Sequence, residues 1–287
     1  MSIALDTLLS RRSVRSFDGR PLDAEDRDAL EAVLAEPGPG PFGAAPRVRL
    51  LAAAQAGLED ADRAPARIGA YGVVSGARAW LVGAIENGPD ACVDFGYAFE
   101  GIVLAAAERG VGTCWLGGTF SRGAAARAIG LAEGELLPAI SPVGYPADRR
   151  ALVDAAFRLG AGSDGRKPWR ELFFDGEPGR PLPASGLGDW AGILEAVRRA
   201  PSASNRQPWR LVRDAPGRIR LLFAENRAYN RALEPVRVQE LDLGIAMRHL
   251  AEACAATGRT GAWARLSEDA AKPAAPFAYH ATWLGDA

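Results

Sequence analysis

The chain has 287 residues, of which 48% are hydrophobic and 24% are charged, and this composition is typical of a soluble globular protein with a sizeable core. Its 34 lysines and arginines nearly balance its 35 aspartates and glutamates, and the net charge of -1 excludes a general attraction to nucleic acid or to an anionic membrane. Any anion that it binds must therefore be held by a local cluster of basic residues.

Cysteine, histidine and hydropathy narrow the class of protein further. Three cysteines without a CxxC spacing or a signal segment argue against a secreted disulfide scaffold. No apolar run is long enough to cross a bilayer, so we expect a cytoplasmic protein. The two histidines, His249 and His280, have no ligand cluster or nucleophile beside them, so we expect packed or surface imidazoles, no metal site and no catalytic side chain. If the chain is an enzyme, a cofactor carries the chemistry.

The first part of the chain alternates helical and strand-like segments. Asp23 can cap a helix over residues 23–36, which ends at Pro37, and a Gly/Pro stretch covers residues 37–46. There follow the strand VRLLAAA, a helix, the strand AWLVGAI, a helix over residues 94–109, the segment TCWLGG, a short helix over residues 122–130 and the strand LPAISPVGYP, closed by a Gly-Tyr-Pro turn. The helix over residues 94–109 has small and apolar residues on more than one face, which indicates a helix buried between layers.

The second part begins after a stretch rich in Gly, Pro and charge. Residues 147–188 have the composition of a linker or an extended arm. The helix–strand pattern then restarts with a helix over residues 189–199, the loop PSASNRQPW, the strands RLVRD and RIRLLFAE, a long helix over residues 238–257 and a last strand over residues 277–283.

The two parts match residue against residue, which indicates an internal duplication. Glu31-Ala32-Val33 and Pro37 match Glu195-Ala196-Val197 and Pro201 at an offset of 164, since 195 − 31 and 201 − 37 are equal. At a second offset of 148, Asp94, Gly96, Ala98, Gly110 and Trp115 match Asp242, Gly244, Ala246, Gly258 and Trp263. Each half is then expected to represent one subunit of an ancestral dimer.

Two segments carry side chains suited to a bound ligand. The segment RRSVRSF places Arg11, Arg12 and Arg15 around Ser13, and guanidinium groups with a hydroxyl can bind phosphate oxygens. By itself the pattern also fits a solvated surface cluster. The loop PSASNRQPW offers side-chain amides that suit a ring edge with both carbonyl and N–H groups, although a helix stop with local hydrogen bonds gives the same pattern.

Taken together, RRSxRxF, PSxxNxQPW, GxGTCWLGG, GYP and the downstream RKP resemble the flavin mononucleotide (FMN)-dependent nitroreductase family over nearly the whole chain. In that family each flavin lies at a homodimer interface, with the PSxxNxQPW loop from one subunit and the other motifs from its partner. The order of motifs here is similar to the fused, pseudo-dimeric branch of the family. The resemblance implies an α+β fold of two half-domains, each a mostly antiparallel sheet flanked by helices. We place them at residues 1–165 and 189–287, with a connecting arm over residues 166–188.

The resemblance implies a single flavin site, because only one combination of halves keeps both sets of motifs. At the offset of 164, Ser202, Ser204, Asn205 and Gln207 fall on Gly38, Gly40, Pro41 and Gly43, which carry no polar side chain, and the second half has no RRSxR segment before its first helix. One FMN per chain is therefore expected. Since a fused pair completes its own site, we expect a monomer.

The resemblance also implies a role for each matching residue. Arg11, Arg12 and Ser13, with Arg166 and Lys167, would hold the phosphate end, and Arg15 would reach the pyrimidine edge. Leu116, Gly117 and Gly118 would lie against the ring, with a glycine N–H donated to N5, and Pro201, Ser202, Asn205 and Gln207 would close the site. Two departures concern the RKP motif: Asp164 stands where a further base is common, and Trp169 follows it in place of leucine. The first departure weakens the phosphate assignment of Arg166.

The activity implied by the resemblance is a two-step, ping-pong oxidoreduction. NADH or NADPH would give hydride to flavin N5, and a nitroaromatic, quinone or similar electron-poor acceptor would then take the electrons. Three alternatives stay open: a protein that stores or delivers FMN without turnover, another reaction on the same scaffold such as flavin degradation or reductive dehalogenation, and a structural pseudo-dimer without flavin. The sequence does not decide between NADH and NADPH, or the physiological substrate.

Overall fold

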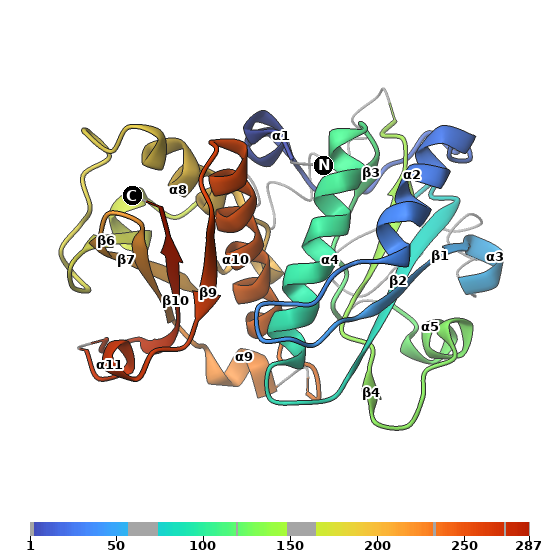
Figure 1. Ribbon diagram of the computed structural model, residues 1–287. Coiled ribbons are helices and arrows are strands. Elements are labelled where there is room, and N and C mark those ends of the chain that lie inside the picture. The colour runs from blue at the N-terminus through green and yellow to red at the C-terminus, as the bar shows by residue number, and fades with distance from the viewer. Residues whose placement is uncertain are drawn as a thin grey trace.

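The computed structural model describes residues 3–56, 74–118, 120–147, 165–231, 234–272 and 274–286. Two long helices, α4 (Ala91–Glu108) and α10 (Val238–Ala256), stand side by side at the centre, with one sheet on the outer side of each (Figure 1). The predicted α+β class with two half-domains is therefore confirmed. Among the described residues, no helix combines the length and the apolar character that crossing a membrane requires.

The first half contains a five-stranded sheet in the order β1-β2-β5-β3, with β4 paired to β2, and every pairing is antiparallel. Its β2 strand is buried at seven of its eight positions, because it lies in the middle of the sheet and both faces are covered. The elements are α2 (Ala24–Ala35), β1 (Arg47–Ala52), α3 (Ala53–Ala56), β2 (Ala79–Glu86), α4, β3 (Gly112–Thr113), α5 (Arg122–Ile129), β4 (Glu135–Leu136) and β5 (Ile140–Gly144).

The second half contains a five-stranded sheet in the order β6-β7-β8-β10-β9, antiparallel except for the parallel pair β6–β7. Its elements are α7 (Trp169–Leu172), β6 (Phe173–Asp175), α8 (Asp189–Arg199), the 3₁₀ turn η3 (Ala203–Asn205), β7 (Trp209–Ala215), β8 (Arg218–Phe223), α9 (Arg227–Arg231), α10, β9 (Gly261–Ala264), α11 (Ser267–Ala270) and β10 (Ala278–Gly285). The predicted arm thus contributes α7 and an edge strand to this sheet.

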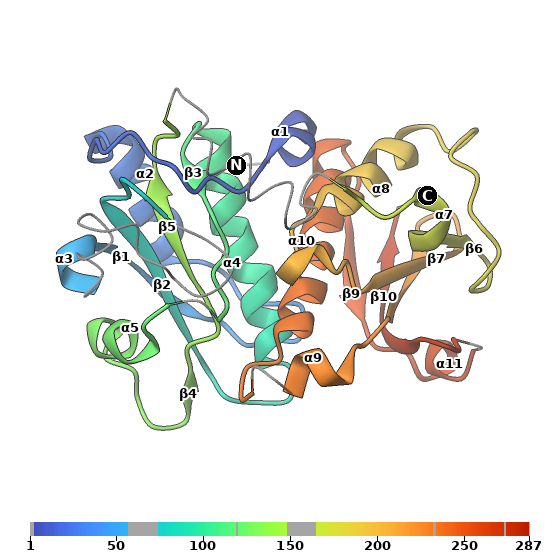
Figure 2. The same cartoon turned by 180° about the vertical axis from the view of Figure 1, so that it is seen from behind.

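The N-terminal helix α1 (Leu5–Ser10) packs on the second half, although it precedes the first half in the chain (Figure 2). Its Leu8 is fully buried in the same apolar cluster as Trp190 and Ile193 of α8. A helix of six residues is too short to be stable alone, so its place depends on this packing. The basic segment that follows α1 therefore starts at the boundary between the halves.

The central helices cross at two glycines that the duplication relates to each other. A Cβ added at Gly96 would lie 2.3 Å from the carbonyl oxygen of Leu241, and one added at Gly244 would lie 2.0 Å from that of Val93. Both pairs correspond at the offset of 148, since 244 − 96 and 241 − 93 are equal. The two contacts are thus equivalent under a pseudo-twofold, as at the interface of a symmetric dimer.

The offset of 164 between the two halves changes within the loop that connects the helix α2 or α8 to the strand that follows it. The helices α2 and α8 end at Ala35 and Arg199, which are 164 apart, whereas β1 and β7 begin at Arg47 and Trp209, which are 162 apart. The loop of the first half is therefore two residues longer, and the pairing of individual loop residues at 164 does not extend to the strands. Its sequence PGPGPFGAAP nevertheless has no polar side chain at any position.

Several predicted element ends differ from the structure for local reasons. Asp23 lies at the N-cap of α2, but its side chain makes no capping hydrogen bond. The central helix begins at Ala91 instead of Asp94, and Asp94 lies in its first turn, where the carboxylate accepts the backbone N–H groups of Phe42 and Ala44. Of the helix predicted between the first two strands, only α3 falls within the described residues.

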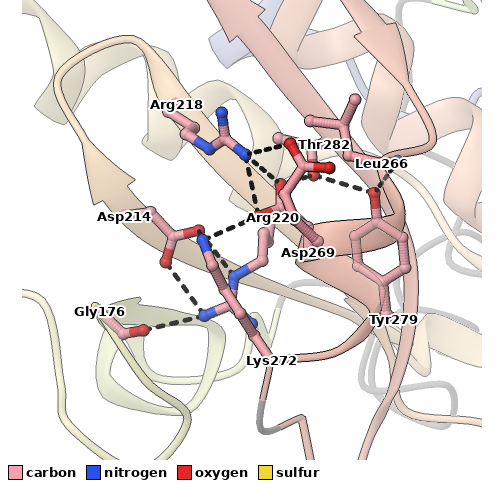
Figure 3. A network of polar contacts seen from close by, with 10 residues as sticks. Gly176, Asp214, Arg218, Arg220, Leu266, Asp269, Lys272, Tyr279 and Thr282 are labelled. Carbon is pink, nitrogen blue, oxygen red and sulfur yellow. Dashed lines mark hydrogen bonds and ion pairs between the residues drawn. The ribbon is translucent and has the colours of Figure 1, made fainter.

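A network of charged side chains ties α11 to the second sheet (Figure 3). It contains Asp214, Arg218, Arg220, Asp269, Lys272 and Thr282. Asp269 is fully buried and receives hydrogen bonds from Lys272 at 2.8 Å, Thr282 at 2.6 Å and Arg218 at 2.9 Å. Burial alone would raise the pKa of Asp269, but these three donors outweigh it and lower the pKa to about 2.

Candidate active site

The basic segment, residues 11–15, runs as extended chain beside β3. It begins at the C-cap of α1, and Ser13 forms a parallel bridge with Thr113. The Val14 N–H donates to the Thr113 carbonyl at 2.8 Å. Because Thr113 opens the segment TCWLGG, the structure brings together two motifs that are about a hundred residues apart in the sequence. Arg12 is exposed, whereas Ser13 and Arg15 are half-buried.

Arg11 is a buried cation whose donors are largely unused. Its side chain is 3% exposed, and its Nε lies 3.9 Å from Glu100 Oε1, which is an ion pair without a hydrogen bond. Within the described part of the chain, Nε and Nη1 have no hydrogen-bond partner. Buried polar groups are normally bonded, and a guanidinium is well shaped to bind phosphate oxygens. Arg11 therefore fits an anionic group.

Glu100 of α4 joins Arg11 to the second half. Its Oε2 accepts the indole N–H of Trp115 at 2.6 Å, and its Oε1 faces His249 Nε2 at 2.9 Å. His249 Nδ1 lies 2.9 Å from the carbonyl oxygen of Ala196, and because a carbonyl only accepts, Nδ1 carries a proton. Both Glu100 and His249 are fully buried. Glu100 therefore lies between Arg11 of the basic segment and His249 of the second half, and it forms a hydrogen bond with the histidine but not with the arginine.

The glycine segment, residues 116–118, lies against the start of α10. The backbone of Leu116 pairs with Ile140 in both directions at 3.0 Å. A Cβ added at Gly117 would lie 3.6 Å from Val238, so this position faces the second half at ordinary contact distance. Gly118 is exposed, and its N–H donates to no described residue. The segment therefore presents free backbone at the boundary between the halves.

The GYP turn holds the chain that follows the basic segment. The Tyr145 hydroxyl donates to Asp26 at 2.6 Å and accepts the N–H of Asp23 at 3.2 Å, while the Tyr145 carbonyl accepts the N–H of Asp18 at 3.0 Å. Burial, together with the bond to Asp26, raises the pKa of Tyr145 to about 12. The hydroxyl thus stays protonated, and the turn fixes residues 18–26 to the first sheet.

The amide loop, residues 201–207, has a strained backbone. Among described residues other than glycine, positive φ angles occur only at Ser204 (48°), Asn205 (52°) and Gln207 (48°). Left-handed backbone costs energy for residues with a Cβ and is concentrated at functional sites. The concentration of all three in the loop that the sequence assigns to a ligand supports that assignment.

Arg166 and the backbone of Lys167 hold this loop from the connecting arm. Arg166 Nη1 donates to Asn205 Oδ1 at 2.7 Å, and the Lys167 N–H donates to Gln207 Oε1 at 2.9 Å. The Gln207 amide donates in turn to Asn205 Oδ1 at 3.0 Å, and Gln207 is 1% exposed. The structure therefore uses these amides to organise the loop, and their contact with a flavin stays a prediction. Asp164 lies outside the described residues.

The amide loop and the glycine segment meet at the first turns of α10. Asp242 Oδ1 accepts the N–H of Ala203 at 2.9 Å, one helical turn beyond the Val238 that faces Gly117. Asp242 is buried, and its Oδ2 has no hydrogen-bond partner among the described residues. Burial raises the pKa of Asp242 to about 8, so this carboxyl holds a proton at neutral pH.

The glycine segment and the start of α10 have a pseudo-symmetric counterpart, and there side chains fill the space between the two halves. At the offset of 148, Gly117 and Val238 correspond to Arg265 and Asp90, since 265 − 117 and 238 − 90 are equal. Arg265 Nη2 lies 2.6 Å from Asp90 Oδ1, and its guanidinium carbon lies 3.8 Å from the ring centre of Phe42. The ring of His280 packs edge-on against Phe42, and burial lowers the pKa of His280 to about 4. Of these two corresponding positions, only the one at Gly117 presents glycine backbone that carries no side chain.

Comparison with known proteins shows the family to which the chain belongs. A family model described as "Putative TM nitroreductase" matches residues 4–254. The chain belongs to this nitroreductase family. The match spans both halves of the nitroreductase and includes the basic segment, the glycine segment and the amide loop. No curated protein sequence matches the chain.

One solved structure shows the same fold, and two others are similar to about half of the chain. A structure described as a "putative nitroreductase" from Thermotoga maritima covers 99% of this nitroreductase and 92% of its own chain, with a TM-score of 0.58 and 20% identity. A nitroreductase from Bacteroides fragilis, solved with bound FMN, covers 50% of this chain and 88% of its own, with a TM-score of 0.39 and 22% identity. Another with bound FMN, from Desulfitobacterium hafniense, covers 52% of this chain and 92% of its own, with a TM-score of 0.41 and 22% identity.

Sequence reasoning missed three residues of the site in this nitroreductase. Glu100 is a lone acid in the apolar stretch AFEGIV, and that isolation is a signal for a buried polar role. His249 and Arg122 carry no such signal, since the first is identified only by the carboxylate opposite it and the second only by the carbonyl groups that it binds.

Proposed function

We propose that this nitroreductase binds one FMN between its halves and transfers electrons from NADH or NADPH to nitroaromatic, quinone or similar electron-poor acceptors. When bound, FMN supplies hydride transfer at its N5 atom. The single observation that carries the proposal is Arg11, whose side chain is 3% exposed and whose Nε and Nη1 atoms have no hydrogen-bond partner among the described residues. FMN is the cofactor that the motif resemblance implies, and its phosphate would supply hydrogen-bond acceptors for these two nitrogen atoms.

The phosphate end would be held by Arg11, Arg12 and Ser13, with Lys167 and Arg166 contributing from the arm. Arg166 already donates to Asn205 and to the Arg199 carbonyl at 3.0 Å, so it adds positive charge while it organises the amide loop. Arg15 would stabilise negative charge at the pyrimidine edge of a reduced flavin.

The ring would lie between backbone from the first half and the amide loop from the second. Gly117 and Gly118 permit a close approach that a side chain would prevent, and Leu116 fixes them to β5 through Ile140. Pro201, Ser202, Asn205 and Gln207 would close the other side. No side chain need act as a nucleophile, because the protein supplies placement and charge.

The main alternative is a protein that stores or delivers FMN without turnover. Purified protein, reconstituted with FMN and freed of excess, should be yellow and should consume NADH or NADPH steadily when a nitroaromatic or a quinone is added. Bound FMN without such consumption would replace the proposal by the storage function. A protein that stays colourless after incubation with FMN would overturn flavin chemistry altogether.

A further inference from the structure

Arg122 binds the glycine segment from the side of α5. It is the first residue of α5, and its Nη2 donates to the Gly117 carbonyl oxygen at 2.5 Å. Its Nη1 donates to the Leu137 carbonyl oxygen, also at 2.5 Å. One guanidinium therefore staples the glycine segment to the chain that leads into β5.

Among the described residues, no carboxylate forms an ion pair with the guanidinium group of Arg122. Its guanidinium carbon also lies 5.0 Å from the ring centre of Phe120. Arg122 is half-buried, and burial lowers its pKa. Both terminal nitrogen atoms are thus committed to backbone carbonyl groups.

Binding one carbonyl oxygen also sets the direction of the next N–H. Gly117 C=O and Gly118 N–H belong to the same peptide unit, and in the described chain cis peptides occur only before Pro235 and Pro276. In a trans peptide the C=O and the N–H point in opposite directions. Because Arg122 holds the oxygen on the α5 side, the Gly118 N–H must point away from α5. Gly118 is an exposed residue, and its N–H has no acceptor among the described residues.

We propose that Arg122 is a positioning residue that aims the Gly118 N–H at the flavin N5 atom. The inference rests on the proposed FMN site and assigns the donor within the glycine segment. Glycines have free backbone rotation, so without the staple this peptide unit can turn over and present its oxygen in place of its N–H. An oxygen in that position could not donate to N5.

The test compares FMN with 5-deaza-FMN, in which a carbon atom replaces N5 and cannot accept a hydrogen bond. Equilibrium titration of the full-length apoprotein gives the affinity ratio of the two ligands. We expect the wild-type protein to prefer FMN by about two- to tenfold, the usual effect of one neutral hydrogen bond. Arg122→Met should reduce this ratio to about one, mainly by weakening FMN.

Arg127→Met is the matched control, because Arg127 lies on the same helix and is exposed. It should leave the ratio unchanged. Arg122→Gln provides a second test if the methionine variant does not fold, since its amide is too short to reach both carbonyl groups. A ratio that stays at the wild-type value in a folded Arg122 variant would overturn the inference even if both affinities fall together. If the wild-type protein binds neither ligand, it is the FMN proposal that fails.

Discussion

His249 of the second half faces Glu100 of the first half across 2.9 Å, and both side chains are fully buried between the two central helices. Glu100 also accepts the indole N–H of Trp115. At the offset of 148 the corresponding residues are Gly101 and Arg248, so the duplication does not repeat this contact. The contact between Glu100 and His249 therefore joins the two halves asymmetrically.

We expect Glu100→Ala to destabilise the protein much more than Glu100→Gln. Alanine leaves His249 and Trp115 buried without partners, and breaking a buried pair costs about 3–5 kcal/mol. Glutamine can donate to His249 and accept from Trp115, so its loss should be about 1 kcal/mol. Urea unfolding of both variants measures the difference. Equal losses would show that the hydrogen bonds at this position contribute little.

Arg11→Ala should weaken FMN far more than riboflavin. The lost partner is the phosphate, which riboflavin lacks, and a charge-assisted hydrogen bond contributes about 1.5–3 kcal/mol, or roughly 10- to 150-fold in affinity. Fluorescence titration with both ligands gives the two changes, and Arg127→Ala serves as the exposed control. A similar loss for both ligands would place Arg11 away from the phosphate.

The sequence predicted the parts of the fold that depend on local patterns. The helices, the buried central helix and the duplication followed from periodicity, Gly/Pro signals and repeated residues such as Gly96 and Gly244. It could not predict that α1 packs on the second half, because six residues with Leu8 inward fit any apolar groove. Nor could it show that the loop offset shifts from 164 to 162, since the two additional residues lie among glycines and prolines.

The candidate site was predictable only in part, because contacts between residues far apart in the sequence are not specified by local patterns. Motifs brought Arg11, Gly117 and Asn205 to attention, but each was treated as a ligand contact. The structure also shows that Asn205 accepts a hydrogen bond from Arg166, and it pairs Glu100 with His249 over 149 positions of sequence. Such pairs depend on which helix faces meet, and helix spacing alone does not specify that.

The glycines at the helix crossing should not tolerate a methyl group. An added Cβ would lie 2.3 Å from Leu241 O at Gly96 and 2.0 Å from Val93 O at Gly244, and backbone atoms cannot move aside cheaply. Gly96→Ala and Gly244→Ala should each cost about 1–3 kcal/mol or more. At Gly123 of α5 the nearest atom is 3.6 Å away, on Arg127, so Gly123→Ala should be neutral or stabilising by up to about 1 kcal/mol. Thermal unfolding of the three variants provides the comparison.

The charged network of Figure 3 predicts a stability loss in acid. The pKa of Asp269 falls from an ordinary 3.8 to about 2 on folding, so the folded state favours the ionised form. Its contribution is complete above about pH 4 and is lost as the pH falls through 3.8 towards 2. The wild-type protein should therefore lose stability over this range more steeply than Asp269→Asn. Parallel urea midpoints from pH 6 to pH 2 would contradict this assignment.

Saturating FMN should bind at about one molecule per chain, because the counterpart of the site is closed by its own side chains. Arg265 stands where the site has Gly117, and it is fixed by Asp90 at 2.6 Å and by the ring of Phe42. Arg265→Gly would reopen the backbone there but would restore neither a basic segment nor a polar loop, since residues 37–46 carry no polar side chain. Equilibrium dialysis should thus end near one FMN for the wild-type protein and for Arg265→Gly. An end point near two for the wild-type protein would show that the second place admits a flavin. An end point near two for Arg265→Gly alone would show that this arginine, and not the missing motifs, closes it.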